Sequence, residues 1–318
     1  MIEPTVIFMG TPQFAVPALR ALAEQPYLIT VVTQPDRPAG RGGRPTPPPV
    51  KVAAEQLGLP ILQPETLKDP DFRAQLAAMR PDVTVLVAYG EYVPPSLLDL
   101  PRTGSINLHP SLLPRWRGST PIQSAILAGD PVTGVTIIRM DRGLDTGPII
   151  AQRSVPINPE ETAPQLSERL AHIGAQLLVE VLPAWLRGEI QPVPQPEEAA
   201  TVTHMLSKED GLIDWNRPAE EIARRVRALQ PWPGTYTTWR GRHLKVVRAR
   251  PLSAPPGITP LPPGTIAVLN YAGAKIPVVW TADGVLALEQ VQLAGKPIIE
   301  ARALLSGYPR IVGDRLGT

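Results

Sequence analysis

The sequence predicts an α/β fold, in which a Rossmann-like, mostly parallel sheet domain is followed by a small OB-like β-barrel domain. Three observations predict it: alternating strand and helix signals in the first half, several short strand-like runs in the second, and an aperiodic Pro- and Glu-rich stretch between them. A chain of 318 residues is long enough for two domains, each with its own core. We place the domains at residues 1–189 and 207–318, with a linker at 190–206.

The first half contains short runs rich in Val, Ile and Leu, which are typical of buried parallel strands. The expected strands are Thr5–Met9, Leu28–Thr33, Asp82–Ala88 and Ser105–Leu108. Stretches with helical periodicity lie between them at Phe14–Glu24, Val50–Leu57 and Asp71–Met79, and a long one at Ala163–Leu186 closes the domain. Such alternation predicts βαβ units and therefore a parallel sheet.

The second half has a different pattern. One helix is expected at Ala219–Leu229, followed by strands separated by turns such as Arg240–Gly241, Pro263–Gly264 and Asp283–Gly284. The expected strands are Thr235–Trp239, Leu244–Arg248, Thr265–Leu269, Pro277–Trp280 and Val285–Leu293. Short strands with frequent turns predict a small barrel of the oligonucleotide-binding type.

Composition excludes several classes of protein and of site. The chain has no Cys, which excludes disulfides, thiolate catalysis and Cys-ligated zinc, and its four His lack metal-ligand spacing. No apolar run reaches the roughly 18 residues of a membrane span, and MIEPTVIFMG lacks the features of a signal peptide. We therefore expect a cytoplasmic protein with no metal and no membrane partner.

Charge is unevenly distributed along the chain. The net charge is only +2, yet residues 206–318 hold 15 basic against 9 acidic side chains. Between residues 221 and 250 the ratio is eight to one. Such a cluster indicates a polyanionic partner such as nucleic acid, or else an exposed surface whose Arg side chains pair locally.

The most informative stretch is residues 105–147, SINLHPSLLPRWRGSTPIQSAILAGDPVTGVTIIRMDRGLDTG. Asn107 and His109 are two residues apart on a strand, so their side chains project to the same face. They lie at the carboxyl end of the strand, where open α/β sheets bind ligands. Asp145 follows His109 by 36 residues in a Gly-flanked turn. An amide, a titratable base and a carboxylate suit acyl transfer to an amine.

Two Gly-containing loops are further candidates. Gly10-Thr11-Pro12 follows the first strand and could hold a phosphate, although a tight turn is favoured because GxGxxG and P-loop motifs are both absent. The loop at 34–45 carries Arg37, Arg41 and Arg44 among Gly and Pro residues. Arg side chains there could grip phosphates or stack on bases, or the loop could be a disordered surface segment.

At these residues the chain resembles the folate-dependent formyltransferases. NLHPSLLPRWRG with GLDTG downstream carries the resemblance. FMGTPQFAVPAL, VTQPDRPAGRG and LSKEDGLIDW extend it over nearly the whole chain and make it most similar to the members that act on methionyl-tRNA. Single-domain purine transformylases lack the Arg-containing loop and the second domain, whereas Pro110 does not separate the two groups.

The resemblance implies transfer of a formyl group from 10-formyltetrahydrofolate to the α-amine of initiator methionyl-tRNA, which starts translation. It places Asn107, His109 and Asp145 on the catalytic positions. On physical grounds, Asn107 can donate to the oxyanion, His109 can move the protons or stabilise the oxyanion as imidazolium, and Asp145 would orient His109 or hold a relaying water. The resemblance places Ser111, Leu112, Leu113 and Pro114 on the folate-binding positions. We further expect the folate pocket to include Tyr89, Gly90 and Glu91, just after a strand.

The tRNA side is expected to be electrostatic. The loop with Arg37, Arg41 and Arg44 would approach the acceptor stem, and a basic second domain would bind phosphates through its exposed cations. The second-domain candidates are Arg224, Arg240, Arg242 and Lys245. Trp215, Trp232 and Trp239 could stack on bases, although core positions are the commoner use of Trp. We expect a monomer.

Two rival functions remain open at this point. One is formyl transfer to a small-molecule amine, such as a nucleotide or an amino sugar, for which residues 207–318 would be dispensable. The other is a non-enzymatic RNA-binding protein on a Rossmann-like scaffold, which has no use for an Asn–His–Asp set and would tolerate His109→Ala.

Overall fold

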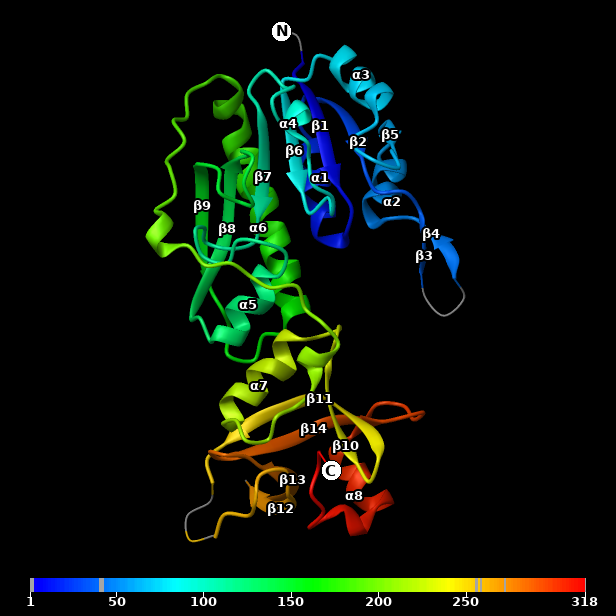
Figure 1. Ribbon diagram of the computed structural model, residues 1–318, viewed down its shortest axis with the longest axis vertical. Helices are drawn as coiled ribbons and strands as arrows, with labels where there is room; N and C mark the ends of the chain where they lie inside the picture. Colours follow the sequence, from blue (N-terminus) through cyan, green and yellow to red (C-terminus); the bar gives the residue numbers. More distant parts are fainter. Residues whose placement is uncertain (1–2, 40–42, 255–256, 258, 272, 318) are drawn as a thin grey trace. The chain divides into compact units, whose positions relative to one another are not determined.

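The structure is a computed structural model that describes residues 3–39, 43–254, 257, 259–271 and 273–317. The chain forms two compact units (Figure 1). The first comprises Met1–Pro121, Pro131–Pro156 and Leu166–Thr203, and the second comprises Ile122–Asp130, Ile157–Gln165 and His204–Thr318.

The first unit is built on a seven-stranded sheet in the order β5-β2-β1-β6-β7-β8-β9. Its strands are β1 (Thr5–Gly10), β2 (Leu28–Val32), β5 (Ile61–Leu62), β6 (Val83–Val87), β7 (Ser105–His109), β8 (Val132–Arg139) and β9 (Ile149–Pro156). The pairs from β5 to β7 are parallel, whereas β8 runs antiparallel to both β7 and β9. This mostly parallel sheet confirms the predicted first half of the fold, and the antiparallel pair β8–β9 is an addition that we did not predict.

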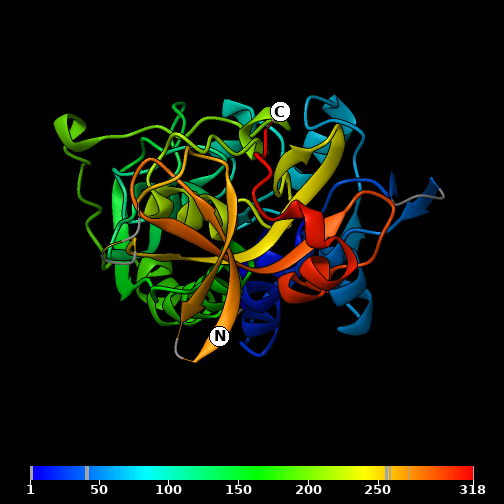
Figure 2. The same ribbon diagram turned by 90° about the horizontal axis from the view of Figure 1, so that it is seen from below.

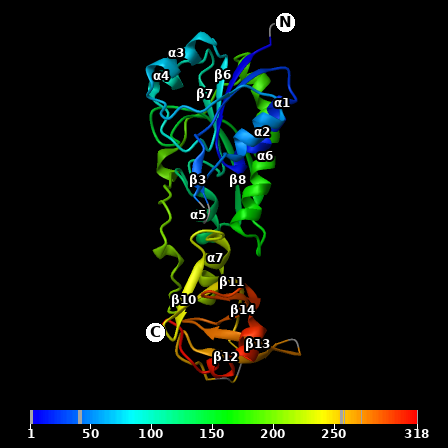
Figure 3. The same cartoon turned by 90° about the vertical axis from the view of Figure 1, so that its right-hand side faces the viewer.

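Helices cover both faces of this sheet. They are η1 (Gln13–Ala15), α1 (Val16–Ala23), α2 (Pro49–Gln56), α3 (Pro70–Ala78), α4 (Pro95–Leu98) and α6 (Ala163–Leu186), with the short η2 (Glu197–Ala199) near the end of the unit. Ile7, Met9 and Leu86 form a core with Phe72 of α3 and Leu97 of α4 on one face. Figure 3 shows α1, α2 and α6 on the opposite face of the same sheet.

A two-stranded hairpin occupies part of the segment that we predicted as a loop at 34–45. Strand β3 (Arg37–Ala39) pairs antiparallel with β4 (Arg44–Thr46), and Lys51 and Gln63 hold Asp36 at its base. Arg41 lies outside the described residues. Each Pro ring on the hairpin fixes an extended backbone, which favours the two strands. The segment lacks the hydrophobic alternation that would predict strands from the sequence.

The second unit contains an antiparallel sheet in the order β10-β11-β14-β13-β12, with β15 beside β14. The strands are β10 (Thr235–Trp239), β11 (Arg242–Leu252), β12 (Ile266–Tyr271), β13 (Ala274–Trp280), β14 (Val285–Leu293) and β15 (Ile299–Glu300). Its helices are α5 (Pro121–Ala128, apart from its first residue), η3 (Glu209–Gly211), α7 (Ala219–Ala228), α8 (Ala301–Gly307) and η4 (Pro309–Ile311). Figure 2 shows the strongly twisted strands of this sheet with α8 (red) beside β14. A mostly parallel unit followed by an antiparallel β unit confirms the predicted fold class.

The core of the second unit explains why α7 forms. Ile222, Ala223 and Val226 lie on one helical face and are buried against Leu244 of β11 and Leu286 of β14. Trp215 and Trp239 belong to this core, whereas Trp232 is 57% exposed. The core expectation therefore fails for Trp232, because the chain leaves the helix at Leu229 and the following Pro-containing turn carries this side chain outward.

Candidate active site

Asn107 and His109 stand at the carboxyl end of β7, between β6 and β8. Leu86 of β6 pairs with Asn107, while Thr136 of β8 pairs with His109. The two side chains share one face of the strand because successive side chains alternate. They are only 7% and 4% exposed, so both polar groups need partners within the protein.

Asp145 lies in the turn between β8 and β9. Its φ is +54°, a left-handed conformation that is unfavourable for a residue with a Cβ. A Cβ on Gly147 would lie 1.8 Å from the Arg139 carbonyl oxygen, so only glycine fits there. The surrounding structure therefore holds this turn in one shape, and that shape aims the carboxylate back at β7.

The three predicted catalytic residues converge through the Asp145 carboxylate. Asn107 Nδ2 donates to Asp145 Oδ1 at 3.2 Å, and the backbone N–H of Gly118 donates to Oδ2 at 2.8 Å. His109 Nδ1 lies 3.6 Å from the same Oδ2. Residues 38 positions apart in sequence thus form one buried polar cluster.

The closest partner of the imidazole is a backbone carbonyl. His109 Nε2 donates to the Trp116 oxygen at 2.9 Å, and a carbonyl can only accept, so Nε2 carries a hydrogen. In the neutral imidazole Nδ1 is then the basic nitrogen, and it faces Asp145. We expected Asp145 to orient His109 or to hold a relaying water; the Trp116 carbonyl, which we did not predict, also orients the ring.

A cavity of about 160 Å³ opens beside this cluster. Asn107 and Asp145 line it together with apolar side chains of both neighbouring strands and the loop after β6, among them Leu86, Val93 and Ile138. An apolar slot with an amide and a carboxylate at one end suits a flat aromatic ring that carries a reactive group. This chemistry fits the pterin end of a folate.

The residues predicted to bind folate lie on two sides of the cluster. Glu91 lines the cavity, and its Oε1 accepts from the backbone N–H of Leu67 at 3.3 Å. Gly90 is exposed next to it, whereas the Tyr89 ring is buried. Burial, and then the charge of Glu91, raises the pKa of the Tyr89 phenol, so Tyr89 contributes packing and a backbone carbonyl that accepts from the Thr11 hydroxyl.

Ser111–Pro114 form a wall that is tied to β8 rather than to the cavity lining. The Thr136 hydroxyl donates to the Ser111 carbonyl at 2.6 Å and accepts from the Leu113 N–H at 3.1 Å. Gln152 donates to the Leu113 carbonyl at 2.8 Å. Leu112 and Pro114 are half-buried. These bonds fix the course of the loop from His109 to Trp116.

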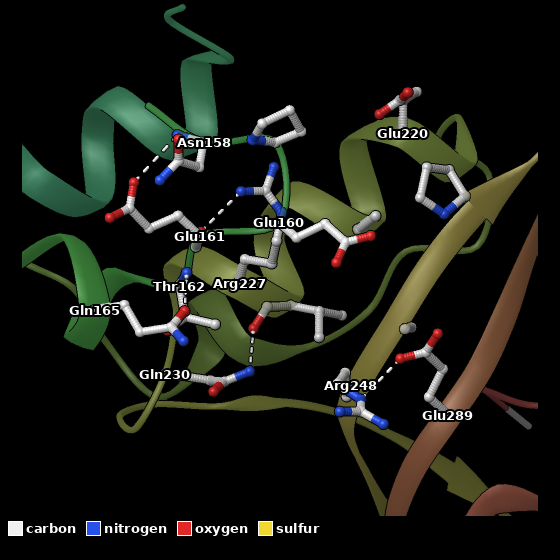
Figure 4. A pocket seen from close by; sticks show the side chains of 15 residues that line it. Asn158, Glu160, Glu161, Thr162, Gln165, Glu220, Arg227, Gln230, Arg248 and Glu289 are labelled. Atoms are coloured by element: carbon white, nitrogen blue, oxygen red, sulfur yellow. Dashed lines mark hydrogen bonds and ion pairs between the residues drawn. The ribbon is translucent and has the colours of Figure 1, made fainter. Parts of the chain in front are cut away.

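A larger cavity, of about 660 Å³, lies in the second unit (Figure 4). Its charged groups are mostly engaged with the protein: Arg248 pairs with Glu289 at 2.7 Å, and Arg227 donates to the Glu161 carbonyl at 2.9 Å. Gln230 donates to two backbone carbonyls. Size therefore does not identify the reactive site, because these polar groups are occupied by other parts of the protein.

The cations predicted to bind tRNA differ in their present partners. In the first unit, Arg37 pairs with Glu65 at 3.5 Å with both side chains exposed, and Arg44 belongs to β4. In the second, Arg240 pairs with Asp314 at 2.9 Å, and Arg224 donates to the Leu127 carbonyl at 3.3 Å. Exposed ion pairs contribute little to stability, so replacing such a carboxylate partner with a tRNA phosphate costs little free energy.

The outer face of β10 and β11 is both aromatic and basic. The rings of Tyr236 and His243 stack with centroids 4.5 Å apart, next to the exposed Lys245. Burial, followed by the charges of Lys245 and Lys208, lowers the pKa of His243. This face combines an exposed cation with flat rings, two features of nucleic-acid-binding surfaces. Arg242 belongs to the opposite side of β11, where it pairs with Trp239 in the register and lies over the Tyr308 ring at 5.8 Å.

Two buried polar residues beside the site were not predicted. Arg117 is 5% exposed and pairs with Glu197 at 2.8 Å, and Gln195 contacts both Arg117 and the Asp145 turn. Gln195 stands in the aperiodic stretch that we predicted as a linker, where no residue pattern distinguishes it. The RWRG motif contains Arg117, but sequence alone gives no partner for it.

Comparison with known proteins places the chain in a family. Residues 5–182 match the formyl transferase family model, and residues 205–309 match the model of the formyl transferase C-terminal domain. The methionyl-tRNA formyltransferase of Chloroflexus aurantiacus (strain J-10-fl) is 50% identical over 303 residues, which cover 95% of this chain and 96% of that one. That of Dehalococcoides mccartyi is 43% identical over 322 residues and covers both chains completely. The chain belongs to the methionyl-tRNA formyltransferase family.

Solved structures agree with this family in fold. HypX from Aquifex aeolicus in complex with tetrahydrofolic acid has a TM-score of 0.64 at 16% identity; the match covers 96% of this chain, which spans about half (48%) of HypX. The N-formyltransferase of Helicobacter canadensis, solved with folinic acid and dTDP-3-aminofucose, has a TM-score of 0.65 at 16% identity, with 90% of this chain and 99% of that chain covered. Both share the two-part α/β architecture.

Among the helices that the structure describes, none has the length and apolar character needed to span a membrane. In the described part of the chain, no group of three or more His, Cys, Asp or Glu side chains is placed to hold a metal ion.

Proposed function

We propose that this chain transfers the formyl group of 10-formyltetrahydrofolate to the α-amine of initiator methionyl-tRNA, and that Asn107, His109 and Asp145 carry the chemistry. The observation that supports it most is the convergence of these three side chains on the Asp145 carboxylate, next to a cavity that Asn107 and Asp145 line, in a member of this family. In the reaction the amine nitrogen bonds to the formyl carbon and the bond from that carbon to the folate nitrogen breaks. The amine loses a proton, and the folate nitrogen gains one.

Asn107 acts on the formyl oxygen. Its amide has two N–H donors, and the contact with Asp145 occupies one of them. The other can donate to the oxygen as it becomes negative during attack. Removing such a donor typically costs about 2.7–4 kcal/mol of barrier height.

His109 moves the proton. The Trp116 carbonyl holds the hydrogen on Nε2, which leaves Nδ1 as the nitrogen that can accept a proton from the amine. The imidazolium formed in this way lies 3.6 Å from the Asp145 carboxylate, which stabilises its charge. The same proton can then pass to the folate nitrogen, so one residue serves both halves of the reaction.

The pterin end of the folate would occupy the apolar cavity beside Asn107. Leu86, Val93 and Ile138 would exclude water from one side of the ring, and Glu91 and Asp145 would approach from the other lining segments. Ser111–Pro114, tied to β8, would form a rigid wall for the rest of the donor. Rigid walls matter because a displacement of about 1 Å can cost roughly 100-fold in rate.

We assign tRNA binding to residues 207–318, with residues 1–189 as the catalytic domain and 190–206 joining them. The outer face of β10 and β11, with Lys245, would bind phosphates, and Arg224, Arg240 and Arg242 would add positive charge elsewhere on the unit. In the first unit the hairpin with Arg37 and Arg44, together with Arg41, would meet the acceptor end. The protein would act as a monomer in the cytoplasm.

A formyl-transfer assay tests this proposal. Wild type, His109→Ala and the exposed control His172→Ala are supplied with 10-formyltetrahydrofolate and either methionyl initiator tRNA or glycinamide ribonucleotide. We expect formylation of the tRNA alone, lost by about 10²–10⁴-fold in His109→Ala and unchanged in the control. Transfer to the nucleotide would reassign the acceptor to a small amine, and full activity of His109→Ala would contradict the assigned site.

A further inference from the structure

Residues 193–203, which follow the long helix α6 of the first unit, lie along the active site. Val193 forms an antiparallel bridge with Ile149, and Val202 forms a parallel bridge with Arg117. We call residues 193–203 the strap. Its Thr201 hydroxyl accepts from the N–H of Trp116 at 2.8 Å. Since the Trp116 carbonyl orients His109, the strap reaches the imidazole through one intervening residue.

Gln195 connects the strap to the Asp145 turn. Its Nε2 donates to the carbonyl oxygens of both Asp145 and Gly147, each at 2.7 Å. Its Oε1 accepts from Arg117 Nε at 3.1 Å and Nη2 at 2.9 Å. The amide thus uses both donors and both acceptor lone pairs, and the side chain is 8% exposed.

These contacts hold the turn at the point where its backbone is least favourable. Asp145 has its φ at +54°, a conformation that persists only where the surrounding structure enforces it. One amide group pins the carbonyls on both sides of the turn, and Arg117 in turn fixes that amide. The carboxylate that faces Asn107 and His109 therefore takes its direction from Gln195.

We propose that Gln195 is a positioning residue for formyl transfer, which acts by holding the Asp145 turn in its reactive shape while Arg117 holds Gln195. Gln195 is not among the residues that line the cavity, and its side-chain amide bonds only to Arg117 and to the Asp145 turn. Its effect therefore passes through Asp145, and the inference rests on the proposed function. If Gln195 served stability alone, its substitution would lower the stability of the fold but would not change the contribution of Asp145 to the reaction rate.

The test is a double-mutant cycle with Gln195→Glu and Asp145→Asn. Gln195→Glu keeps the size of the side chain and an acceptor for Arg117, but it removes both N–H donors and sets oxygens against two carbonyls. Single-turnover formylation at saturating substrates should slow about 10- to 100-fold, with KM for tRNA within twofold of wild type. Gln176→Glu, the same change at an exposed position on α6, should leave both values unchanged.

The cycle distinguishes a positioning role of Gln195 from a purely structural one. In the Asp145→Asn background, Gln195→Glu should slow the reaction by no more than twofold, since the group that it positions has lost its charge. Equal slowing in both backgrounds, or a kcat unchanged by Gln195→Glu alone, would overturn the inference. Gln195→Met, which adds no charge, repeats the cycle if Gln195→Glu does not fold.

Failure of the proposed function would have a different signature. If wild type transferred no formyl group to methionyl-tRNA, the proposed function and this inference would both fall. If wild type were active and Asp145→Asn slow, but the two substitutions multiplied independently, only the role of Gln195 would be wrong.

Discussion

The catalytic cluster of the first unit buries its polar side chains, whereas the basic face of the second unit exposes its cation to solvent. Asn107, His109 and Asp145 are largely buried, and each is fixed by a named hydrogen bond or ion pair. Lys245 is exposed on the outer face of its strand. Buried, shared contacts make each catalytic group depend on the others, whereas exposed cations act additively and are screened by salt.

After His109→Ala, the largest effect should follow from Asn107→Ala. The variant loses the donor to the developing oxyanion, and turnover should fall by about 10²–10³-fold. Single-turnover formylation measures it. Asn158→Ala, at an exposed residue that lines the larger cavity of the second unit, is the matched control and should be fully active. The reverse pattern would move the chemistry to that larger cavity.

Gly147→Ala tests whether the Asp145 turn needs its shape. The added Cβ would lie 1.8 Å from the Arg139 oxygen, so the turn must shift. We expect about a 10-fold loss of kcat and roughly 1–3 kcal/mol of stability in denaturant unfolding. Gly307→Ala is the control, because Gly307, like Gly147, has no positive φ, and its Cβ would meet nothing within 4 Å. If both variants kept wild-type kcat, the turn would not position Asp145.

Lys245→Ala should change binding and not chemistry. Loss of one phosphate contact should lower affinity for tRNA a few-fold and reduce the slope of log Kd against log salt by about 1, with kcat unchanged. Fluorescence titration over a range of salt concentrations measures the slope. Lys275→Ala, an exposed lysine on β13, should leave it unaltered. An equal change in both variants would mean that net charge, and not this face, sets the affinity.

The smallest effect concerns a charge remote from both sites. Burial by itself raises the pKa of Asp82, but the Thr5 N–H and the Arg102 guanidinium outweigh burial and lower that pKa. A lowered pKa means that Asp82 stabilises the fold above about pH 3.9 and that this contribution is lost as pH falls through the folded value.

Asp82→Asn should therefore cost roughly 1 kcal/mol at neutral pH, a value reduced by partial exposure, and should flatten the acid limb of stability. Urea unfolding between pH 2 and 7 measures this dependence, and formylation should be unchanged. A variant that keeps the acid limb of the wild type would show that other carboxylates cause it.

Sequence reasoning succeeded where one residue pattern carried the information. The shared face of Asn107 and His109 on β7 follows from strand geometry. The long helix Ala163–Leu186 has the bounds that its periodicity predicts. Gln195 and Thr201 could not be found in this way. Each is a polar side chain whose partner lies 50 or 85 residues away, and such a pairing leaves no periodic signal.

The second unit shows the same limit. The excess of basic residues predicted a positive surface, yet the partner of Arg240 is Asp314, 74 residues later. Local charge counts cannot reveal which cations are already paired. The division of labour between the buried cluster and the exposed face therefore rests on contacts that only the folded chain brings together.

The most direct test of this division measures both tRNA affinity and single-turnover rate at saturating tRNA for His109→Ala and Lys245→Ala. The account predicts that His109→Ala keeps its Kd within twofold but loses at least about 10² in rate, while Lys245→Ala keeps its rate and binds more weakly. If His109→Ala instead lost tRNA binding while its rate at saturation stayed at the wild-type value, the first unit would not hold the catalytic centre.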